Sequence, residues 1–244
     1  MSIVVNTNIG SLNAQRSLAE SSRELSTAME RLSSGKKINS AADDAAGFAI
    51  AERMTAQVRG LNMATKNAND GLAMLATIEN ATNDVTDMLQ RIRELAVQAA
   101  NDTNGTQDRT YLQTEVDSLV AEINRVSTDT VYNDSVVLDG NLSGSLQVGT
   151  ASGQTIDFAI TSIDTTTLGV DALDLSDATN AATALTAIDS AIETVAGNRA
   201  GYGALSNRLE YTVSNLMNVA EFTTAARSRI EDADFAAESA RLAK

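Results

Sequence analysis

Apolar residues return every three or four positions over long stretches of this 244-residue chain. The longest run lies between Leu61 and Ala99 and keeps its apolar and small side chains on one helical face. Such spacing predicts one continuous amphipathic helix from about Asp44 to Asn101. At 1.5 Å per residue this helix would be on the order of 85 Å long, which favours a rod over a compact domain. The run consists of Leu61, Thr65, Ala68, Leu72, Leu75, Ile78, Thr82, Val85, Leu89, Ile92, Ala96 and Ala99.

A second, narrower seam lies near the N-terminus. Leu18, Leu25 and Leu32 recur every seventh position, with polar and charged residues between them. This spacing predicts an amphipathic helix over residues 11–32. The helix-poor, glycine-containing residues 33–40 should then form a connector.

Two further helices are expected on the C-terminal side of the long one. A turn-rich break at 101–106 precedes an apolar stripe over 112–126, which favours a helix that folds back antiparallel to the first. A last helical pattern runs over 181–230. We expect the glycines at 197–203 to interrupt it with a bend or a close helix contact.

The residues between 132 and 177 are rich in Ser, Thr, Gly and Asp, and their apolar period changes to two. Alternating apolar residues at 146–148 and 156–160, separated by the turn-forming residues 149–153, predict a β-hairpin. The sequence therefore predicts a mainly α protein. Its long helices would form an elongated antiparallel bundle or coiled coil, with a small β-hairpin region in the middle of the chain.

The composition leaves little room for catalysis or metal binding. The chain contains no Pro, His, Cys or Trp, so a Ser-His-Asp triad, a thiol nucleophile and a Cys/His zinc site are all ruled out. The pair Asp43 and Asp44 suits the N-terminus of a helix better than a metal site. The glycines at 197–203 match no phosphate-binding motif. We expect no enzyme, no catalytic residue, no metal and no cofactor.

A formal net charge of −14 argues against nucleic acid and anionic membranes as partners, because both attract Lys and Arg. The N-terminus lacks a basic region followed by an apolar stretch of signal-peptide length, so we expect no cleaved export signal. The chain also lacks a run of about 18 apolar residues that could cross a membrane.

Several specific stretches resemble one family, the bacterial flagellins. The resemblance covers roughly residues 3–140 and 181–244, and the middle of the chain corresponds to the family's variable outer part. The matching stretches are 5–9 (VNTNI), 12–14 (LNA), 30–47 (ERLSSGKKINSAADDAAG), 67–71 (NANDG), 90–98 (QRIRELAVQ), 201–204 (GYGA), 207–209 (NRL) and 226–236 (ARSRIEDADFA).

The resemblance implies a structural subunit that polymerises with itself into the extracellular flagellar filament. Such proteins leave the cell through the flagellum's own type III export channel, are held by an export chaperone, and meet the flagellar cap and the hook-associated junction proteins. The implied domains are an axial N-terminal helix and spoke (1–42), a helical rod in two parts (43–135 and 181–230), a short variable outer segment (136–180) and the start of an axial C-terminal helix (231–244).

Flagellins usually continue beyond the position of Lys244 with a further helix that ends in an apolar tail. The resemblance therefore implies that most of the axial C-terminal helix, and with it the chaperone site, lies outside this chain. The axial packing stripe of Leu18, Leu25 and Leu32 would then lack its partner, and we expect the chain as written to polymerise poorly.

The segment 90–98 is similar to the part of flagellin that a vertebrate Toll-like receptor recognises. By position, Arg91, Leu95 and Glu115 would be the main contacts, with Arg91 making bidentate charge-assisted bonds and Leu95 serving as an apolar anchor. In the family the same positions also pack neighbouring protomers. The implied receptor and protomer contacts are Gln90, Arg91, Glu94, Leu95, Gln98 and Glu115.

Two alternatives to a filament subunit stay open at this point. A hook–filament junction protein shares the terminal helices, and a secreted coiled-coil adhesin that never polymerises would show similar apolar seams. An enzyme would have to rely on carboxylates and hydroxyls alone.

Overall fold

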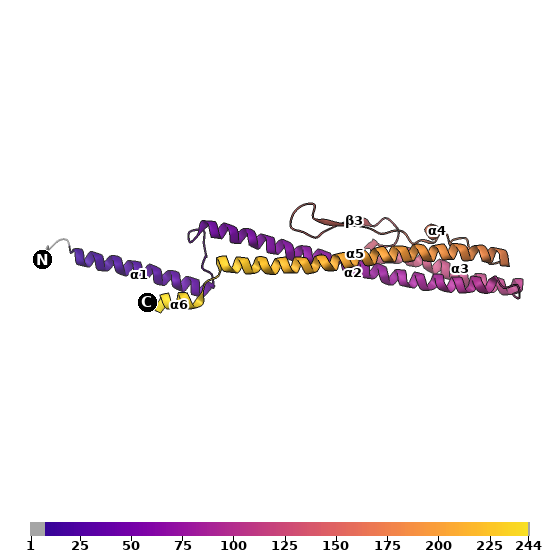
Figure 1. The fold of residues 1–244 in the computed structure, drawn as a ribbon, viewed down its shortest axis with the longest axis horizontal. Coiled ribbons are helices and arrows are strands. Elements are labelled where there is room, and N and C mark those ends of the chain that lie inside the picture. The colour runs from indigo at the N-terminus through magenta and orange to yellow at the C-terminus, as the bar shows by residue number, and fades with distance from the viewer. Residues whose placement is uncertain (1–7, 244) are drawn as a thin grey trace. The chain divides into compact units, whose positions relative to one another are not determined.

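The computed structural model describes residues 8–243, so residues 5–7 of the predicted N-terminal motif and Lys244 lie outside the described part of the chain. Long helices dominate, as predicted, and the short strands all lie in the middle of the chain (Figure 1). The elements are α1 (Ile9–Ser34), α2 (Ala45–Ala99), α3 (Thr106–Asp129), β1 (Val131–Tyr132), β2 (Ser135–Val136), β3 (Ser143–Gln147), β4 (Thr155–Ala159), α4 (Thr165–Leu168), α5 (Ala178–Glu231) and α6 (Phe235–Ala243).

The chain divides into two compact units. Unit 1 consists of residues 1–62 and 218–244, and unit 2 consists of residues 63–217. The two boundaries fall within α2 and within α5. The domain limits inferred from the family resemblance follow other criteria and stay a prediction.

Unit 2 holds the larger hydrophobic core. The predicted seam of α2 is buried there against side chains of α3, α5 and the segment that contains the strands. Ile78, Leu89 and Ile92 from α2, Ile123 from α3 and Ile188 from α5 are all fully buried. Because the seam repeats at helical spacing, one face of α2 supplies core residues along most of its length.

Two antiparallel strand pairs occupy the middle of the chain. The β1–β2 turn places Asn133 and Asp134 at positive φ, the conformation of a two-residue hairpin turn. The predicted β-hairpin is confirmed: β3 and β4 form it, and Leu146 pairs with Ile156. It is attached to α2, because the Nδ2 of Asn67 donates a hydrogen bond to the Gln147 carbonyl at 3.0 Å.

The predicted interruption of the last helix is wrong. α5 runs without a break through the glycines at 197–203. A glycine in a helix interior costs about 1 kcal/mol relative to alanine, which packing can offset. Val195 precedes this stretch, Tyr202 lies within it and Leu209 follows it, and all three side chains are buried. Their packing stabilises the helix across the glycines.

Unit 1 contains α1 and α6, which pack side by side (Figure 1). Gly35 ends α1 in the left-handed conformation that a C-terminal cap requires. The backbones of Lys36 and Asp232 then form an isolated antiparallel bridge. The Nη1 of Arg31 binds the Oε1 of buried Glu238 at 2.8 Å, which ties α6 to the C-terminal half of α1.

The acidic pair at the start of α2 is structural, as expected. Asp44 accepts hydrogen bonds from the backbone N–H groups of Ala46 and Gly47, which is the role of an N-cap. Asp43 accepts from the backbone N–H groups of Ser40 and Asn39, and these bonds lower the pKa of its carboxyl group.

Candidate functional site

The exposed face of α2 carries a continuous row of polar side chains opposite its buried seam. Gln90, Arg91, Glu94 and Gln98 are all exposed on this face. Glu115 is exposed on the neighbouring helix α3. We call these five residues the polar ridge. Gln90, Glu94 and Gln98 follow one another at four-residue spacing, and Arg91 is three positions before Glu94. The turn at 101–105 folds α3 back so that Glu115 comes beside Arg91.

Arg91 is the centre of the polar ridge. Its Nε and Nη2 donate to the same oxygen, Oε1 of Glu115, at 2.9 and 2.8 Å, and its Nη1 donates to Oε2 of Glu94 at 3.0 Å. These hydrogen bonds, the one to Glu115 first, raise the pKa of the Arg91 guanidinium. The side chain is still about half exposed, so it can also meet a partner.

Leu95 does not belong to the polar ridge. Its exposed fraction is 2%, and it is part of the core of unit 2. The implied role of Leu95 as an apolar anchor stays a prediction, and the burial of its side chain in this structure does not favour a direct contact. Ile92, Ala96 and Ala99 are buried along one face of α2, and Leu95, three positions after Ile92 and four before Ala99, lies at the edge of that face.

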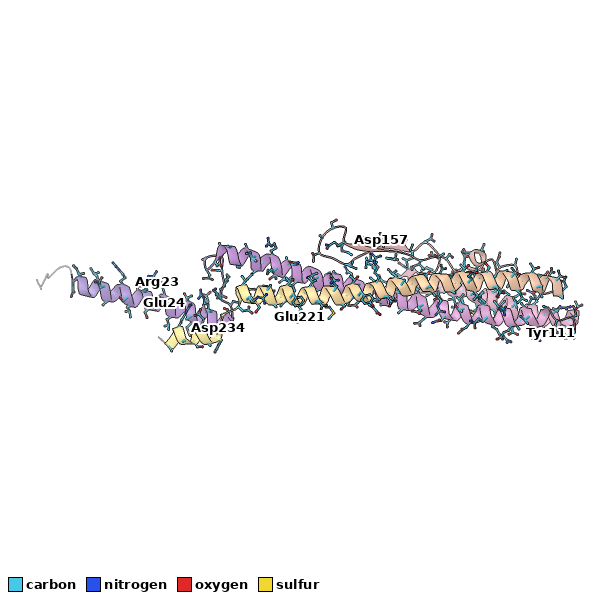
Figure 2. The ribbon with its side chains drawn as sticks, in the orientation of Figure 1. Arg23, Glu24, Tyr111, Asp157, Glu221 and Asp234 are labelled. Carbon is cyan, nitrogen blue, oxygen red and sulfur yellow. The ribbon has the colours of Figure 1, made fainter. Side chains whose placement is uncertain are left out.

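Two side chains that sequence reasoning did not single out hold the ridge in place. The Nε of Arg93 binds Oδ1 of Asp189 on α5 at 2.6 Å, which links α2 to α5. The Nε of Arg109 donates to the Ala99 carbonyl at 2.9 Å and closes the turn between α2 and α3. Tyr111 lies near the same end of α3 (Figure 2). No sequence signal identifies these pairs, because the partners depend on how the helices align.

The predicted axial stripe lies on α1. The side chains of Leu18 and Leu25 are 73% and 52% exposed, whereas Leu32 is half-buried. Figure 2 labels Arg23 and Glu24 on the same exposed length of the helix. Apolar side chains at helical spacing with this much exposure are typical of a surface that another helix covers.

The described residues were also compared with the requirements of a metal site and of a membrane-spanning helix. Across residues 8–243, no group of three or more acidic side chains is placed to hold a metal ion. In that same part of the chain, no helix combines the length and the apolar character that crossing a membrane requires.

Comparison with known families decides between the remaining classes. Residues 5–143 match the bacterial flagellin N-terminal helical region, and residues 185–244 match the bacterial flagellin C-terminal helical region. The chain belongs to the flagellin family. The helices α1 and α2, most of α5 and the polar ridge lie within the matched parts of this flagellin.

Named flagellins are similar over most of the chain. A flagellin of Halalkalibacterium halodurans is 43% identical over 239 residues, which cover 97% of this chain and 88% of that protein. The flagellar filament 33 kDa core protein of Treponema phagedenis is 37% identical over 97% of this chain and 88% of its own length. A Salmonella muenchen flagellin is 48% identical over 178 residues, but this match spans only 35% of the Salmonella protein.

Solved structures agree with this assignment. A Bacillus cereus flagellin is 29% identical and has a TM-score of 0.55 over 62% of this chain and 88% of that one. A putative flagellar hook-associated protein of Vibrio parahaemolyticus has a TM-score of 0.68 over 78% of this chain and all of that one. At 16% identity, the second likeness shows the fold alone.

This flagellin is a structural subunit that polymerises with itself into the bacterial flagellar filament, outside the cell. Its family is one of structural proteins. Neither a junction protein nor a non-polymerising adhesin is favoured by any of the matches. What the comparisons leave open is which residues make the contacts.

Proposed function

We propose that the flagellin makes its filament contacts through two surfaces, the axial stripe of α1 and the polar ridge of α2 and α3. The axial stripe would pack against helices of neighbouring subunits, with Leu18 and Leu25 as its exposed members and Leu32 at its half-buried end. The polar ridge would contact an adjacent protomer through Gln90, Arg91, Glu94, Gln98 and Glu115.

The axial role rests on exposure. Ile9, Leu12 and Met29 of α1 are more than half exposed, as are Leu18 and Leu25. Burying a leucine side chain stabilises an interface by about 2 kcal/mol, so a row of them supplies strong association when it is covered. Uncovered, the same row favours association between chains.

The role of the polar ridge rests mainly on the Arg91 network. Arg91 is held by Glu94 and Glu115 and yet remains about half exposed. An arginine whose guanidinium group is already held in place loses less conformational freedom when it binds a partner. The ridge is therefore suited to a specific polar contact.

The same ridge is our proposed binding surface for the vertebrate Toll-like receptor of flagellin. Arginine is enriched among the residues that dominate binding energy in protein interfaces. Leu95 would act indirectly in this proposal, because its packing in the core fixes the part of α2 that carries Arg91 and Glu94. A receptor that binds the ridge would compete with a neighbouring protomer for it.

The flagellar cap and the hook-associated junction proteins are proposed to meet these surfaces at the two ends of the filament. The terminal subunits of a polymer leave open the contacts that inner subunits fill, so a protein at either end has to match one of them. An export chaperone is a further proposed partner, through the C-terminal site that the family resemblance implies.

Receptor signalling by Arg91→Ala protein tests the polar ridge. We expect roughly tenfold weaker signalling, because the substitution removes the ridge's central contact and releases Glu115. Arg125→Ala is the matched control, since Arg125 is similarly exposed on α3 and also pairs with acidic side chains, Glu122 and Asp129. Equal dose–response curves for the two variants and the parent would contradict the proposal.

A further inference from the structure

A shallow groove lies on the exposed face of α5 within unit 2. Its lining residues are Ala204, Asn207, Arg208, Tyr211, Thr212 and Asn215. Tyr211 is 79% exposed, the largest exposed fraction among the large apolar and aromatic side chains of the described residues. An exposed tyrosine beside an arginine is the combination that dominates many protein interfaces.

Arg208 is a positive charge in strongly negative surroundings. Unit 2 contains 21 acidic and seven basic residues. The basic residues Arg91, Arg93, Arg109 and Arg125 form ion pairs inside the unit. Arg208 forms no ion pair within residues 8–243 and is exposed. Its charge is therefore available to a partner.

The same face of α5 is flat on the N-terminal side of the groove. Gly197, Ala200 and Gly201 are exposed there, at the same helical spacing as Ala204. A Cβ atom added at Gly197 or at Gly201 would meet no atom within 4 Å. Each glycine destabilises the helix relative to alanine. Packing within the chain does not explain why this face is so smooth, whereas the close approach of another helix would.

A complementary surface lies on the exposed face of α2. Glu79, Asp84 and Asp87 are exposed there and form no ion pair within the described residues. Asp84 and Asp87 are three positions apart and so lie on one helical face, Glu79 precedes them on the exposed side of α2, and all three lie just before the polar ridge in sequence. We call these three residues the acidic stripe.

We propose that the α5 groove binds the acidic stripe of a second copy of this chain. The inference rests on the proposed protomer contacts and extends them, because it names the surface that faces α2. A growing polymer needs two different surfaces on each copy, so that every subunit offers one and receives the other. Pairing two copies through the same groove would instead place one Arg208 near another.

Opposite charges select the partner, and Tyr211 supplies most of the contact area. Complementary charges steer association and disfavour wrong pairings, whereas a buried aromatic side chain contributes most of the binding energy. The acidic composition of unit 2 also disfavours nucleic acid as the occupant of the groove.

Charge reversal in the bacterium that makes the protein tests this contact. One strain carries Arg208→Glu, a second carries Asp84→Arg with Asp87→Arg, and a third expresses both variants together. Filament length is measured by electron microscopy and unassembled subunit in the medium by immunoblot. We expect each variant alone to shorten filaments and to release roughly tenfold more free subunit, which corresponds to a tenfold weaker contact.

The strain that expresses both variants provides the decisive comparison. The reversed groove of one variant then meets the reversed stripe of the other, so filaments should return to near the parental length. This rescue requires contact between different chains. Filaments of parental length in both single strains, or no rescue in the mixed strain, would overturn the inference.

Two controls separate this outcome from other failures. The unaltered strain must form filaments, and its failure to do so would count against the filament function itself. Export is read from the total subunit outside the cell, and folding from the thermal midpoint of each purified variant. Because the reversed side chains are exposed and unpaired, we expect these midpoints to stay unchanged.

The glycines give a second, independent test. Gly197→Ala together with Gly201→Ala should raise the unfolding midpoint of the free chain and still shorten the filaments, because the added methyl groups keep the partner helix away. Filaments of unchanged length in the more stable variant would contradict the proposed close approach.

Discussion

Unit 2 contains 21 acidic and seven basic residues, whereas unit 1 contains eleven of each. Buried apolar residues are divided just as unequally. Within the described part of the chain, 30 lie in unit 2 and four in unit 1. Unit 2 thus has a core of its own and a strongly negative surface, while unit 1 has almost no core and no net charge.

The difference shows how a filament subunit distributes its stability. A unit with a hydrophobic core can fold by itself and can tolerate like charges on its surface. Unit 1 exposes more large apolar side chains than unit 2 in a shorter stretch of chain, including Leu18, Phe222 and Phe235. We infer that these side chains obtain their burial from other subunits, and that a neutral unit 1 lets many copies meet without electrostatic repulsion.

The largest expected effect concerns assembly through unit 1. Replacing Leu18 and Leu25 by serine should abolish filaments, because it removes the apolar surface through which we propose that α1 packs in the filament. The free chain should unfold at the same temperature as before, since both side chains are exposed. Electron microscopy and calorimetry check the two halves of this prediction. Ser22→Ala on the same helix is the control and should form normal filaments.

The next effect concerns the core of unit 2. Leu89→Ala should lower the free energy of unfolding of the free chain by about 3 kcal/mol, because it opens a cavity at a fully buried position. Leu25→Ala, the same substitution in unit 1, should change it by less than about 0.5 kcal/mol. Urea denaturation of both variants measures the contrast. Similar losses would show that the two units do not differ as described.

Acid should release α6 from α1 within unit 1. The Arg31 guanidinium lowers the pKa of Glu238, with help from Arg241. A lowered pKa means that the ion pair stabilises the docked helix at neutral pH and loses this effect as the pH falls through the lowered value, below the ordinary glutamate value of about 4.3. Hydrogen exchange of the α6 amides measures the release of α6 from α1. A range from about pH 6 to about pH 3 is suitable, because it brackets the ordinary pKa of a glutamate.

Glu238→Gln is the control for this pH dependence. It should weaken α6 docking at neutral pH and remove most of the change on acidification. The carboxylates of unit 2 whose pKa values are lowered by arginines, Asp189 and Glu122, remain unaltered in this variant. A variant whose α6 still comes loose only in acid would show that another group is responsible.

The smallest expected effect is a gain in the stability of the free chain. Gly201→Ala alone should stabilise the free chain by about 1 kcal/mol, because alanine favours the helix and the site has open space. Chemical denaturation measures this gain. A loss of stability would mean that the chain's own packing requires Gly201. The glycines would then no longer support the proposal that another helix approaches this face of α5.

Much of this fold could be predicted from local sequence. The seam of α2 repeats at helical spacing, so both its helix and its buried face followed from the pattern alone. Gly35 and the turn residues at 101–105 mark helix ends, and the alternating residues on either side of 149–153 mark the β3–β4 hairpin. In each case the signal lies within a few residues of the feature that it predicts.

Features that depend on contacts between residues far apart in the sequence could not be predicted from local patterns. α5 continues through its glycines because Val195, Tyr202 and Leu209 pack in the core, which outweighs local propensity. A family resemblance assigned Leu95 a role as an apolar anchor, and no local pattern showed that its side chain is buried, because its burial depends on how α2 meets its neighbours. Arg93 and Asp189 are 96 positions apart, so no local pattern connects them.

Hydrogen exchange of the free chain and of the assembled filament tests the central claim most directly. If unit 2 is stable by itself and unit 1 depends on neighbours, amides in the unit 2 parts of α2 and α5 should be protected in both states. Amides in the exposed length of α1 should exchange rapidly in the free chain and become protected only in the filament. Equal protection of α1 in the free chain and in the filament would contradict the account.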